Sequence, residues 1–341
     1  MARVCSANFV VCRILLGTLL TLCAYVAAYT SAVFPATAIG AKEEFGFSHE
    51  VSALGTTLYV LGFAAGPTFW GPGSEILGRR IPLLVGIFGF SVFTIASATT
   101  KDLQSLMITR FFSGFFAASP VSLVPASLSD LFDNVQRGAA IGMYTMAVFI
   151  GPFTSSFIGG FTTSSLGWRF TLYIPAFFGF LFFVLHLKFG CETYAPKILS
   201  TKAAEIRRQT QNWGIHARQD ELEIDFRELV RKSLARPVRM LIMEPILFLL
   251  TLYMSFIYGL AYALLQAYPV VFSQVYGMAT GVNGLPFISL IIGLISGTAL
   301  VLFLQRSYAQ KVKANNNITV PEWRLMPCMI GGVMFAVGIF W

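Results

Sequence analysis

Charged residues are scarce in this sequence. They make up 12% of its 341 residues, whereas 56% are hydrophobic and 33 are phenylalanine. A soluble domain needs more polar side chains than this to cover its surface. The shortage excludes a soluble globular protein, and the composition predicts a protein that crosses a membrane several times.

Motifs for metals, disulfides and nucleotides are also lacking. The five cysteines form no CxxC pair, and the three histidines form no HExxH motif. We therefore expect no metal site, no cofactor and no disulfide framework. A GxxxxGK[ST] phosphate-binding loop is missing as well, which excludes transport driven by ATP. No nucleophile–base signature supports the alternative of a membrane-bound enzyme, so we expect no catalytic residue.

The net charge of +8 has two interpretations, a nucleic-acid partner or the orientation of membrane spans. The charges fall between apolar runs, which favours orientation, because Lys and Arg accumulate on the cytoplasmic side. With the N-terminus in the cytoplasm, twenty of the 24 basic residues lie inside, three lie outside and Arg110 lies within a span. This bias predicts a cytoplasmic loop at residues 190–244, an outer loop at residues 41–50 and no nucleic-acid partner.

Long apolar runs define the expected spans, because a helix needs about 20 apolar residues to cross a bilayer. Residues 245–305 are long enough for two spans, and residues 325–341 begin a ninth. We divide the chain into a six-span bundle (1–189), a cytoplasmic loop (190–244) and a partial second bundle (245–341). The six spans of the first bundle are expected at residues 14–41, 51–72, 81–100, 103–129, 138–168 and 168–189.

A charged turn within residues 69–84 separates the second and third spans. Gly71, Pro72 and Gly73 are expected to end the second span, because proline donates no backbone hydrogen bond and glycine weakens helices. The next apolar run begins at Ile81, which leaves room only for a tight turn. The pattern predicts a helical hairpin through the membrane.

Two local patterns predict how other helices pack and begin. Gly62 and Gly66 have the GxxxG spacing that lets a neighbouring helix approach closely. In the cytoplasmic loop, Asp225 and Glu228 form a capping box, which predicts a short amphipathic helix along the membrane surface that ends at Pro237.

Several motifs follow one another in an order that resembles a known family. GPGSEILGRR lies between spans two and three, LMITRFFSG lies in span four, and Gly-Pro followed by Gly-Gly lies in span five. They resemble the signature loop, the fourth-span motif and the antiporter motif of the major facilitator superfamily. Four further segments resemble its fungal drug:proton antiporter branch, which includes multidrug, azole and polyamine exporters: GWRFTLY, CETYAPKIL, RPVRMLIMEP and QAYPVVF.

The sequence also departs from the family pattern. Gly73 stands where the signature loop usually has Leu, and Cys191 where the branch usually has Pro. Ser155 and Ser156 replace a second Gly-Pro, and Gln266 stands where relatives often have Glu. The family has twelve spans, and this chain ends within the ninth. We therefore expect a major facilitator fold with a complete N-terminal bundle and an incomplete second bundle.

Arg110 is the expected proton-coupling residue. A charge inside a span costs about 2.5 to 3.5 kcal/mol on the insertion scale, so it normally faces a partner or a wet cavity. No Asp or Glu lies within the eight complete spans, which leaves water, backbone, substrate or an absent helix as its partner. The resemblance implies a role in proton coupling, and the alternative is a purely structural role.

The resemblance further implies a conformational latch at the cytoplasmic side. The acidic residue of the signature loop, Glu75, faces a helix N-terminus of the second bundle in the family, an interaction of about 0.3 to 2 kcal/mol. Glu75 is also placed to pair with Arg79, or Arg79 with Asp130; the alternative is that the arginines only anchor the topology. The expected latch comprises Gly71, Glu75, Gly78, Arg79, Arg80 and Asp130, and the expected antiporter-motif hinge comprises Gly151, Pro152, Gly159 and Gly160.

Two polar stripes predict the walls of a substrate cavity. Their residues recur every three or four positions, so each stripe lies on one helix face. Ordinary hydrogen bonding between helices is the alternative. Span one carries Thr18, Thr21, Tyr25 and Tyr29, and span seven carries Thr251, Ser255, Tyr258, Tyr262 and Gln266. Aromatic walls with few charges are suited to bulky amphipathic or weakly cationic solutes.

These expectations together describe a secondary transporter. We expect a monomer in the lipid bilayer of the plasma membrane that exports small amphipathic or cationic molecules in exchange for protons, by alternating access of two bundles. The alternative is a transport-inactive fragment, or a shortened gene model, of such a transporter.

Overall fold

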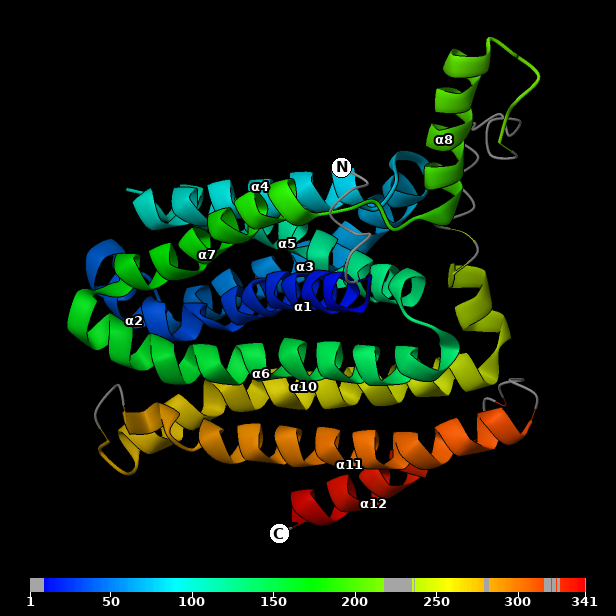
Figure 1. Cartoon of the computed structure of the whole chain (residues 1–341). Helices are drawn as coiled ribbons and strands as arrows, with labels where there is room; N and C mark the ends of the chain where they lie inside the picture. The colour runs from blue at the N-terminus through cyan, green and yellow to red at the C-terminus, as the bar shows by residue number, and fades with distance from the viewer. Residues whose placement is uncertain are drawn as a thin grey trace.

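The computed structural model describes residues 9–217, 235, 237–278, 282–315, 320, 323 and 326–340. All regular structure in these residues is helical, which confirms the all-α fold class (Figure 1). The elements are α1 (Phe9–Ala32), α2 (Phe34–Phe45), α3 (His49–Leu77), α4 (Arg80–Thr99), α5 (Leu103–Leu131), α6 (Asn134–Leu166), α7 (Trp168–Phe189), α8 (Ala195–Thr210), α10 (Pro245–Gln274), the 3₁₀ turn η1 (Val282–Gly284), α11 (Phe287–Ala314) and α12 (Met326–Phe340).

In the part of the chain that the structure describes, seven helical segments are long and apolar enough to cross a membrane. They are α1 with the start of α2, and α4, α5, α6, α7, α10 and α11. The second expected span forms α3, which has the length of a span and packs along α5 but is not one of these seven segments. The expected ninth span forms the shorter apolar helix α12.

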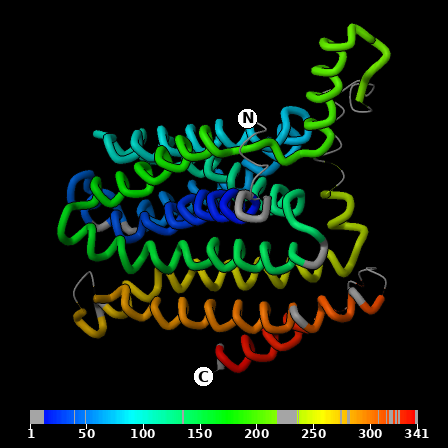
Figure 2. Tube along the Cα trace, in the orientation of Figure 1, coloured from blue at the N-terminus to red at the C-terminus, as the bar shows by residue number. Residues whose placement is uncertain are grey.

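The helices lie side by side in two groups (Figures 1 and 2). The first group, α1 to α7, has a core in which Leu20, Leu83 and Leu123 are almost completely buried. The second group, α10 to α12, lies against it mainly through α11, which packs on α6. Because α6 also packs along α1, it connects the two groups.

The expected first span is not one straight helix. It breaks at Val33, between α1 and α2, because Pro35 has no amide hydrogen to continue the backbone ladder. α2 then continues to Phe45, through part of the stretch that was expected to be a loop. The bend therefore separates two helical segments at a buried position.

The expectation that Gly71, Pro72 and Gly73 end the second span was wrong. α3 continues through these residues to Leu77. Pro72 removes only one backbone hydrogen bond, and the Ser74 hydroxyl donates to the Gly71 carbonyl at 2.7 Å. The turn of the hairpin is consequently limited to two residues between α3 and α4.

The loop that was expected to be cytoplasmic, residues 190–244, contains a helix that was not predicted, α8. The capping box at Asp225 and Glu228 lies outside the described residues, and so does most of the short helix that was expected to end at Pro237. Residues 237–243 are themselves helical.

The basic loop expected from Arg306 begins later than predicted. α11 extends to Ala314, so Arg306 and Lys311 lie on the helix. Basic residues are favourable in this position because they oppose the partial negative charge of a helix C-terminus. The Asn315 amide also caps this end by donating to the Lys311 carbonyl at 3.1 Å.

Candidate transport site

Arg110 lies two turns after the start of α5 and is only 1% exposed. Its Nη1 donates to the Thr30 carbonyl at 3.3 Å, one turn before the break between α1 and α2. The guanidinium carbon lies 4.5 Å from the centre of the Phe34 ring and 5.9 Å from that of Tyr59. Of the partners considered from the sequence, the structure therefore provides backbone, together with two aromatic faces.

Two donors of this guanidinium are left without a hydrogen-bond partner among the described residues, Nε and Nη2. A buried donor without a partner costs about 1 to 3 kcal/mol, and more when it is charged. Burying Arg110 therefore costs folding free energy that the contacts around its guanidinium do not fully compensate.

The residues that surround Arg110 could not be predicted from the sequence motif that contains it. Tyr59 of α3 donates from its hydroxyl to the Ala27 carbonyl at 2.9 Å, which fixes its ring beside Arg110. Gly55 makes room for Phe34, because a Cβ at position 55 would lie 2.6 Å from the Phe34 Cζ and closer still to its Cε1. The only sequence signal was Pro35, which predicts a local break in the first span.

The signature turn joins three helices at one end of the molecule. Gly78 has φ +88°, a backbone conformation that favours glycine. The Arg79 guanidinium contacts Asp130 with 3.6 Å between Nε and Oδ2, and it also donates to the Ser74 hydroxyl. Of the pairings left open by the sequence, the structure shows the one between Arg79 and Asp130.

Glu192, just before α8, is a member of this network that sequence reasoning missed. Its carboxylate accepts the backbone amides of Arg79 at 2.8 Å and Arg80 at 3.2 Å, and so caps the start of α4. It also accepts the amides of Thr193 and Tyr194 at 3.1 and 3.0 Å. A Cβ at Gly78 would overlap this carboxylate, which gives a second reason for glycine there.

We expect Glu192→Ala to lower the free energy of unfolding by about 1 to 2 kcal/mol, the usual effect of losing a helix cap. Thermal unfolding of the purified protein in detergent would measure this loss. Glu192→Gln should show a smaller loss, because one oxygen remains to accept hydrogen bonds. Glu205→Ala, on the exposed surface of α8, is the control and should leave the midpoint unchanged. Equal midpoints for both alanine variants would contradict the capping role.

The residues of the antiporter motif lie where α6 meets α1. A Cβ at Gly151 would lie 2.9 Å from the Tyr29 amide, and one at Gly159 would lie 3.2 Å from the Ala36 Cβ. Gly160 is buried on the same helix, and Pro152 lies within α6 without ending it. Gly151 thus permits a close approach of α6 to α1, and Gly159 a close approach of α6 to α2; a hinge at this position stays a prediction.

Hydroxyl groups connect α1 to α6 and α10. The Tyr25 hydroxyl lies 2.8 Å from the Thr154 hydroxyl, and the Ser31 hydroxyl lies 2.8 Å from that of Tyr262. Tyr29 is buried beside Tyr25, and its hydroxyl has no hydrogen-bond partner among the described residues. Within the stripe of span one, Tyr25 therefore faces α6 of the same group, and Thr18 is exposed. The contact with the second group comes from Ser31, which is not part of the stripe.

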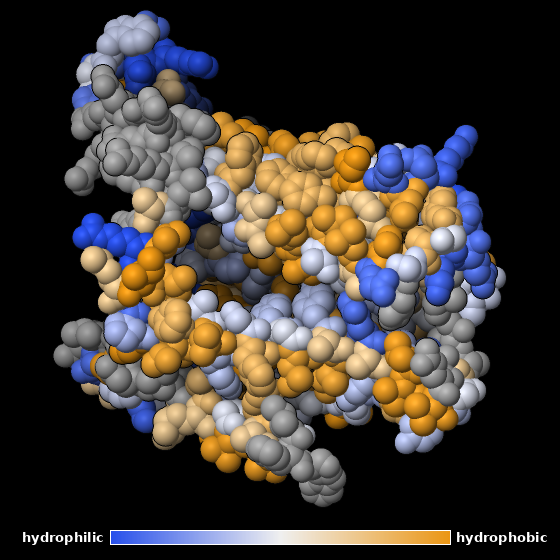
Figure 3. Space-filling model, turned by 180° about the vertical axis from the view of Figure 1, so that it is seen from behind, coloured by the Kyte–Doolittle hydropathy of each residue, from blue (hydrophilic) through white to orange (hydrophobic). Residues whose placement is uncertain are grey.

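The stripe of span seven lines open space along α10. A cleft of about 360 Å³ is bordered by Thr251, Ser255 and Tyr258. A smaller gap of about 70 Å³ between the helix groups is bordered by Tyr258 and Tyr262. Gln266 is exposed and borders neither of these spaces. Figure 3, which shows the side opposite to Figure 1, shows a hollow between the two groups of helices.

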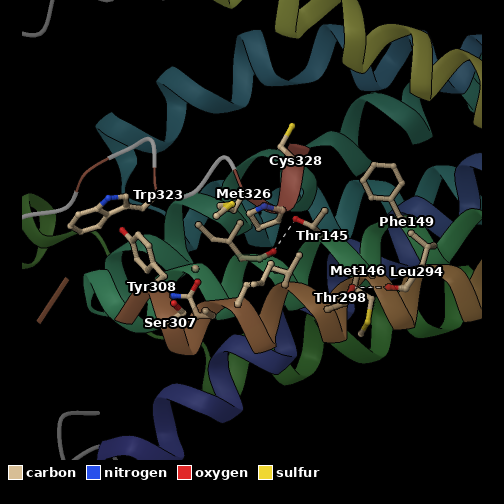
Figure 4. A pocket seen from close by; sticks show the side chains of 18 of the residues that line it. Thr145, Met146, Phe149, Leu294, Thr298, Ser307, Tyr308, Trp323, Met326 and Cys328 are labelled. Atoms are coloured by element: carbon tan, nitrogen blue, oxygen red, sulfur yellow. Dashed lines mark hydrogen bonds between the residues drawn. The ribbon is translucent and has the colours of Figure 1, made fainter. Parts of the chain in front are cut away.

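A cavity of about 710 Å³ lies between α6, α11 and α12. Figure 4 shows Met146 and Phe149 of α6 together with Tyr308 of α11 around it. Thr145 and Thr298 also border it, but their hydroxyls donate to carbonyls of their own helices. The expected cavity tyrosines are not part of this lining.

At the opposite end of the spans, Glu44 of α2 is held by α7. Arg169 donates to both carboxylate oxygens of Glu44 at 2.6 Å and to the Thr100 carbonyl at 3.1 Å. Trp168 donates to the same carboxylate at 3.1 Å. The hydrogen bonds from Arg169 hold the pKa of Glu44 below its ordinary value. This contact ties the end of α2 to the start of α7.

Comparison with known proteins decides the family. The model of the Major Facilitator Superfamily matches residues 18–341. The chain belongs to this superfamily. It is therefore a multi-pass membrane protein of a transporter family.

The relatives include fungal transporters. An uncharacterized transporter of Schizosaccharomyces pombe, C36.03c, is 47% identical over 96% of this chain and 61% of its own length. The multidrug transporter TPO1_2 of Candida glabrata is 45% identical over 85% of this chain and 50% of its own length. The multidrug transporter FLU1 of Candida albicans is 39% identical over 91% of this chain and 51% of its own length. The chain thus spans about half to three fifths of these relatives.

Solved structures agree on the fold. A structure of the xylose transporter XylE from E. coli in a partially occluded, inward-open conformation matches with a TM-score of 0.59. The match covers 86% of this chain and 72% of that chain at 17% identity. A likeness at this identity supports the major facilitator fold.

Proposed function

We propose that this chain forms the proton-coupling and substrate-binding part of a secondary exporter, which moves small amphipathic or weakly cationic molecules out of the cell in exchange for protons. The observation that carries the proposal is the buried Arg110, whose guanidinium contacts the break between α1 and α2. A cation with two unpartnered donors is costly to retain, and such residues in spans commonly belong to ion or proton pathways.

The contacts of α1 support a route from Arg110 to the substrate. Arg110 is bound to the carbonyl of Thr30, and the next residue, Ser31, contacts Tyr262 of α10. A change in the proton or water contacts of Arg110 would therefore act on the same turn of α1 that touches the second group of helices. We infer that this turn links the proton site to the movement between the groups.

The cytoplasmic network supports a latch. Arg79, Asp130 and Glu192 hold the starts of α4 and α8 and the end of α5 together in this conformation. Alternating access requires that such contacts form in one state and weaken in another. Glu75, Gly71 and Arg80 remain members of the proposed latch, and Glu192 is added to it.

The spaces beside α6 and α10 support the substrate class. Apolar side chains such as Met146, Phe149 and Leu294 line much of the larger cavity, and tyrosine and hydroxyl groups border the cleft along α10. Apolar walls with a few polar groups are typical of sites for drug-sized molecules. We propose the plasma membrane as the location and a monomer as the working unit, as the family resemblance implies.

A second candidate is that the 341-residue chain by itself does not transport. The most apolar 18-residue stretch of α10 has no buried residue, so Thr251 and Ser255 of its polar stripe are exposed among the described residues, whereas Tyr262 still contacts Ser31 of α1. Unsatisfied polar groups that face lipid cost several kcal/mol each.

Expression in yeast that lacks its own exporters would test both candidates. One arm carries this chain, and the other carries the chain joined to the remaining C-terminal part of the Candida glabrata relative. We expect the joined protein to give resistance to at least one azole, cycloheximide or polyamine, and the 341-residue chain to give none at matched expression, because its cleft is open on one side. Resistance from the chain alone would contradict this reading of α10. A joined protein that is inserted and folded but exports none of these compounds would contradict the proposed export.

A further inference from the structure

α8 extends away from the bundle, across the direction of the spans. Figures 1 and 2 show it at the end of the molecule where α3, α5 and α11 also end, projecting sideways past α4 and α7. This is the end at which the basic residues gather, and by the charge bias it faces the cytoplasm. A helix in this position lies where the headgroups of the inner leaflet begin.

One face of α8 is apolar and exposes its two large side chains, although Ala203 between them is buried. Leu199 is 61% exposed and Ile206 is 44% exposed. Their spacing of seven residues is two helical turns, which puts them on one stripe, with the exposed Lys202 between them. Just past the end of α8, Trp213 is 77% exposed. Tryptophan is the residue that membrane interfaces favour most, together with tyrosine.

The charge of α8 is complementary to an anionic surface. Its sixteen residues carry four basic side chains, Lys197, Lys202, Arg207 and Arg208, and one acidic side chain, Glu205. Figure 3 shows hydrophilic residues gathered on the projecting part. The cytoplasmic leaflet is negatively charged, and it attracts basic segments that lie within a Debye length.

We propose that α8 is a membrane-docking helix that places Leu199 and Ile206 among the headgroups of anionic lipids in the inner leaflet. This inference goes beyond the proposed export, because it requires only the described chain in a bilayer. The partner is a lipid surface with negative headgroups. Lys202 reaches those headgroups from the apolar stripe, since a long basic side chain can extend toward the interface.

Docking would act on the signature turn through the first residues of α8. Tyr194 immediately precedes the helix, and its ring lies 5.0 Å from the Arg79 guanidinium carbon. Glu192, two residues earlier, caps α4. A bilayer that fixes the direction of α8 therefore also restricts the segment that holds Arg79.

Site-directed spin labelling of the 341-residue protein would test the proposal. Single cysteines at positions 199 and 206 report on the apolar stripe, and cysteines at the exposed positions 201 and 208 on the other side of α8 serve as matched controls. The native cysteines are first replaced by alanine. The ratio of collisions with oxygen to collisions with a water-soluble nickel chelate is then measured in two kinds of vesicle, phosphatidylcholine alone and phosphatidylcholine with phosphatidylserine.

We expect a ratio several-fold higher at positions 199 and 206 than at 201 and 208 in the vesicles with phosphatidylserine. Lys202→Glu should reduce this difference, and Glu205→Lys should increase it, because the two variants change the charge of α8 in opposite directions. High salt should also reduce it. Water-accessible labels at all four positions with phosphatidylserine present would overturn docking. If the ratios differ by the same amount in vesicles of phosphatidylcholine alone, and if the charge variants do not change this difference, the requirement for anionic lipid would be overturned.

Discussion

We expect Arg110→Ala to abolish proton-coupled export in the joined protein, in which this chain is followed by the C-terminal part of the Candida glabrata relative. The variant should still reach the membrane. The alanine variant removes a charge that is 1% exposed and that binds the α1 turn at Thr30. Without it, no cation remains beside Phe34 and Tyr59 to respond to a proton or to water. Substrate efflux driven by an imposed pH gradient, in vesicles with matched protein content, would measure the loss.

Arg110→Lys should restore only part of the activity. The ammonium group is compact and strongly hydrated, whereas the guanidinium is planar and lies against the Phe34 ring while it donates to a carbonyl. Arg110→Met is the discriminating variant. It has no donors to leave unpaired, so it should raise the free energy of unfolding by about 1 to 3 kcal/mol while export stays absent.

Normal efflux in Arg110→Ala would show that the residue is structural. A structural role would also be indicated if Arg110→Met unfolded more easily than the unaltered protein. Lys101→Ala, a change of an exposed basic residue in the turn before α5, is the control for the removal of one positive charge and should retain export.

Composition and periodicity were sufficient to predict the long spanning helices but not their ends, and they did not reveal α8. Apolar runs located α4, α5, α7 and α10, because the bilayer imposes a minimum length on a spanning helix. The positions of the breaks between helices were harder to predict. Neither Pro35 nor Pro72 has a backbone amide hydrogen to donate, yet of the two only Pro35 lies at a break between helices. The difference depends on packing: Trp70 donates to the Phe115 carbonyl at 2.9 Å and holds that part of α3 against α5.

The candidate site was only partly accessible from the sequence. Arg110 could be found because a charge in an apolar run is conspicuous, and Asp130 because the signature loop resembles a known motif. Glu192 could not, because it lies 113 positions from the Arg79 amide that it binds. Likewise, nothing in the local sequence of Arg110 indicates that Tyr59 and Phe34 would contact it. Long-range contacts of this kind depend on how the helices pack.

Gly114→Ala should destabilise the protein strongly, although alanine is usually the better residue in a helix. A Cβ at Gly114 would lie 2.9 Å from the Tyr59 carbonyl carbon and closer still to its oxygen. The partner Gly62, predicted from the GxxxG spacing, is equally tight: its Cβ would lie 2.6 Å from the Phe115 amide nitrogen. α3 and α5 are thus in backbone contact, and an added methyl group must push them apart, at a cost of about 1 to 3 kcal/mol.

Gly259→Ala is the matched control, because Gly259 also lies inside a helix but has nothing within 4 Å of an added Cβ. There the same substitution should stabilise the protein by about 0.5 to 1 kcal/mol, the ordinary gain of alanine over glycine in a helix. Thermal unfolding of both purified variants would therefore give shifts of opposite sign. Because Tyr59 also contacts Arg110, Gly114→Ala should reduce export per folded molecule in the joined protein, whereas Gly259→Ala should not. Two shifts of the same sign would contradict the close crossing of α3 and α5.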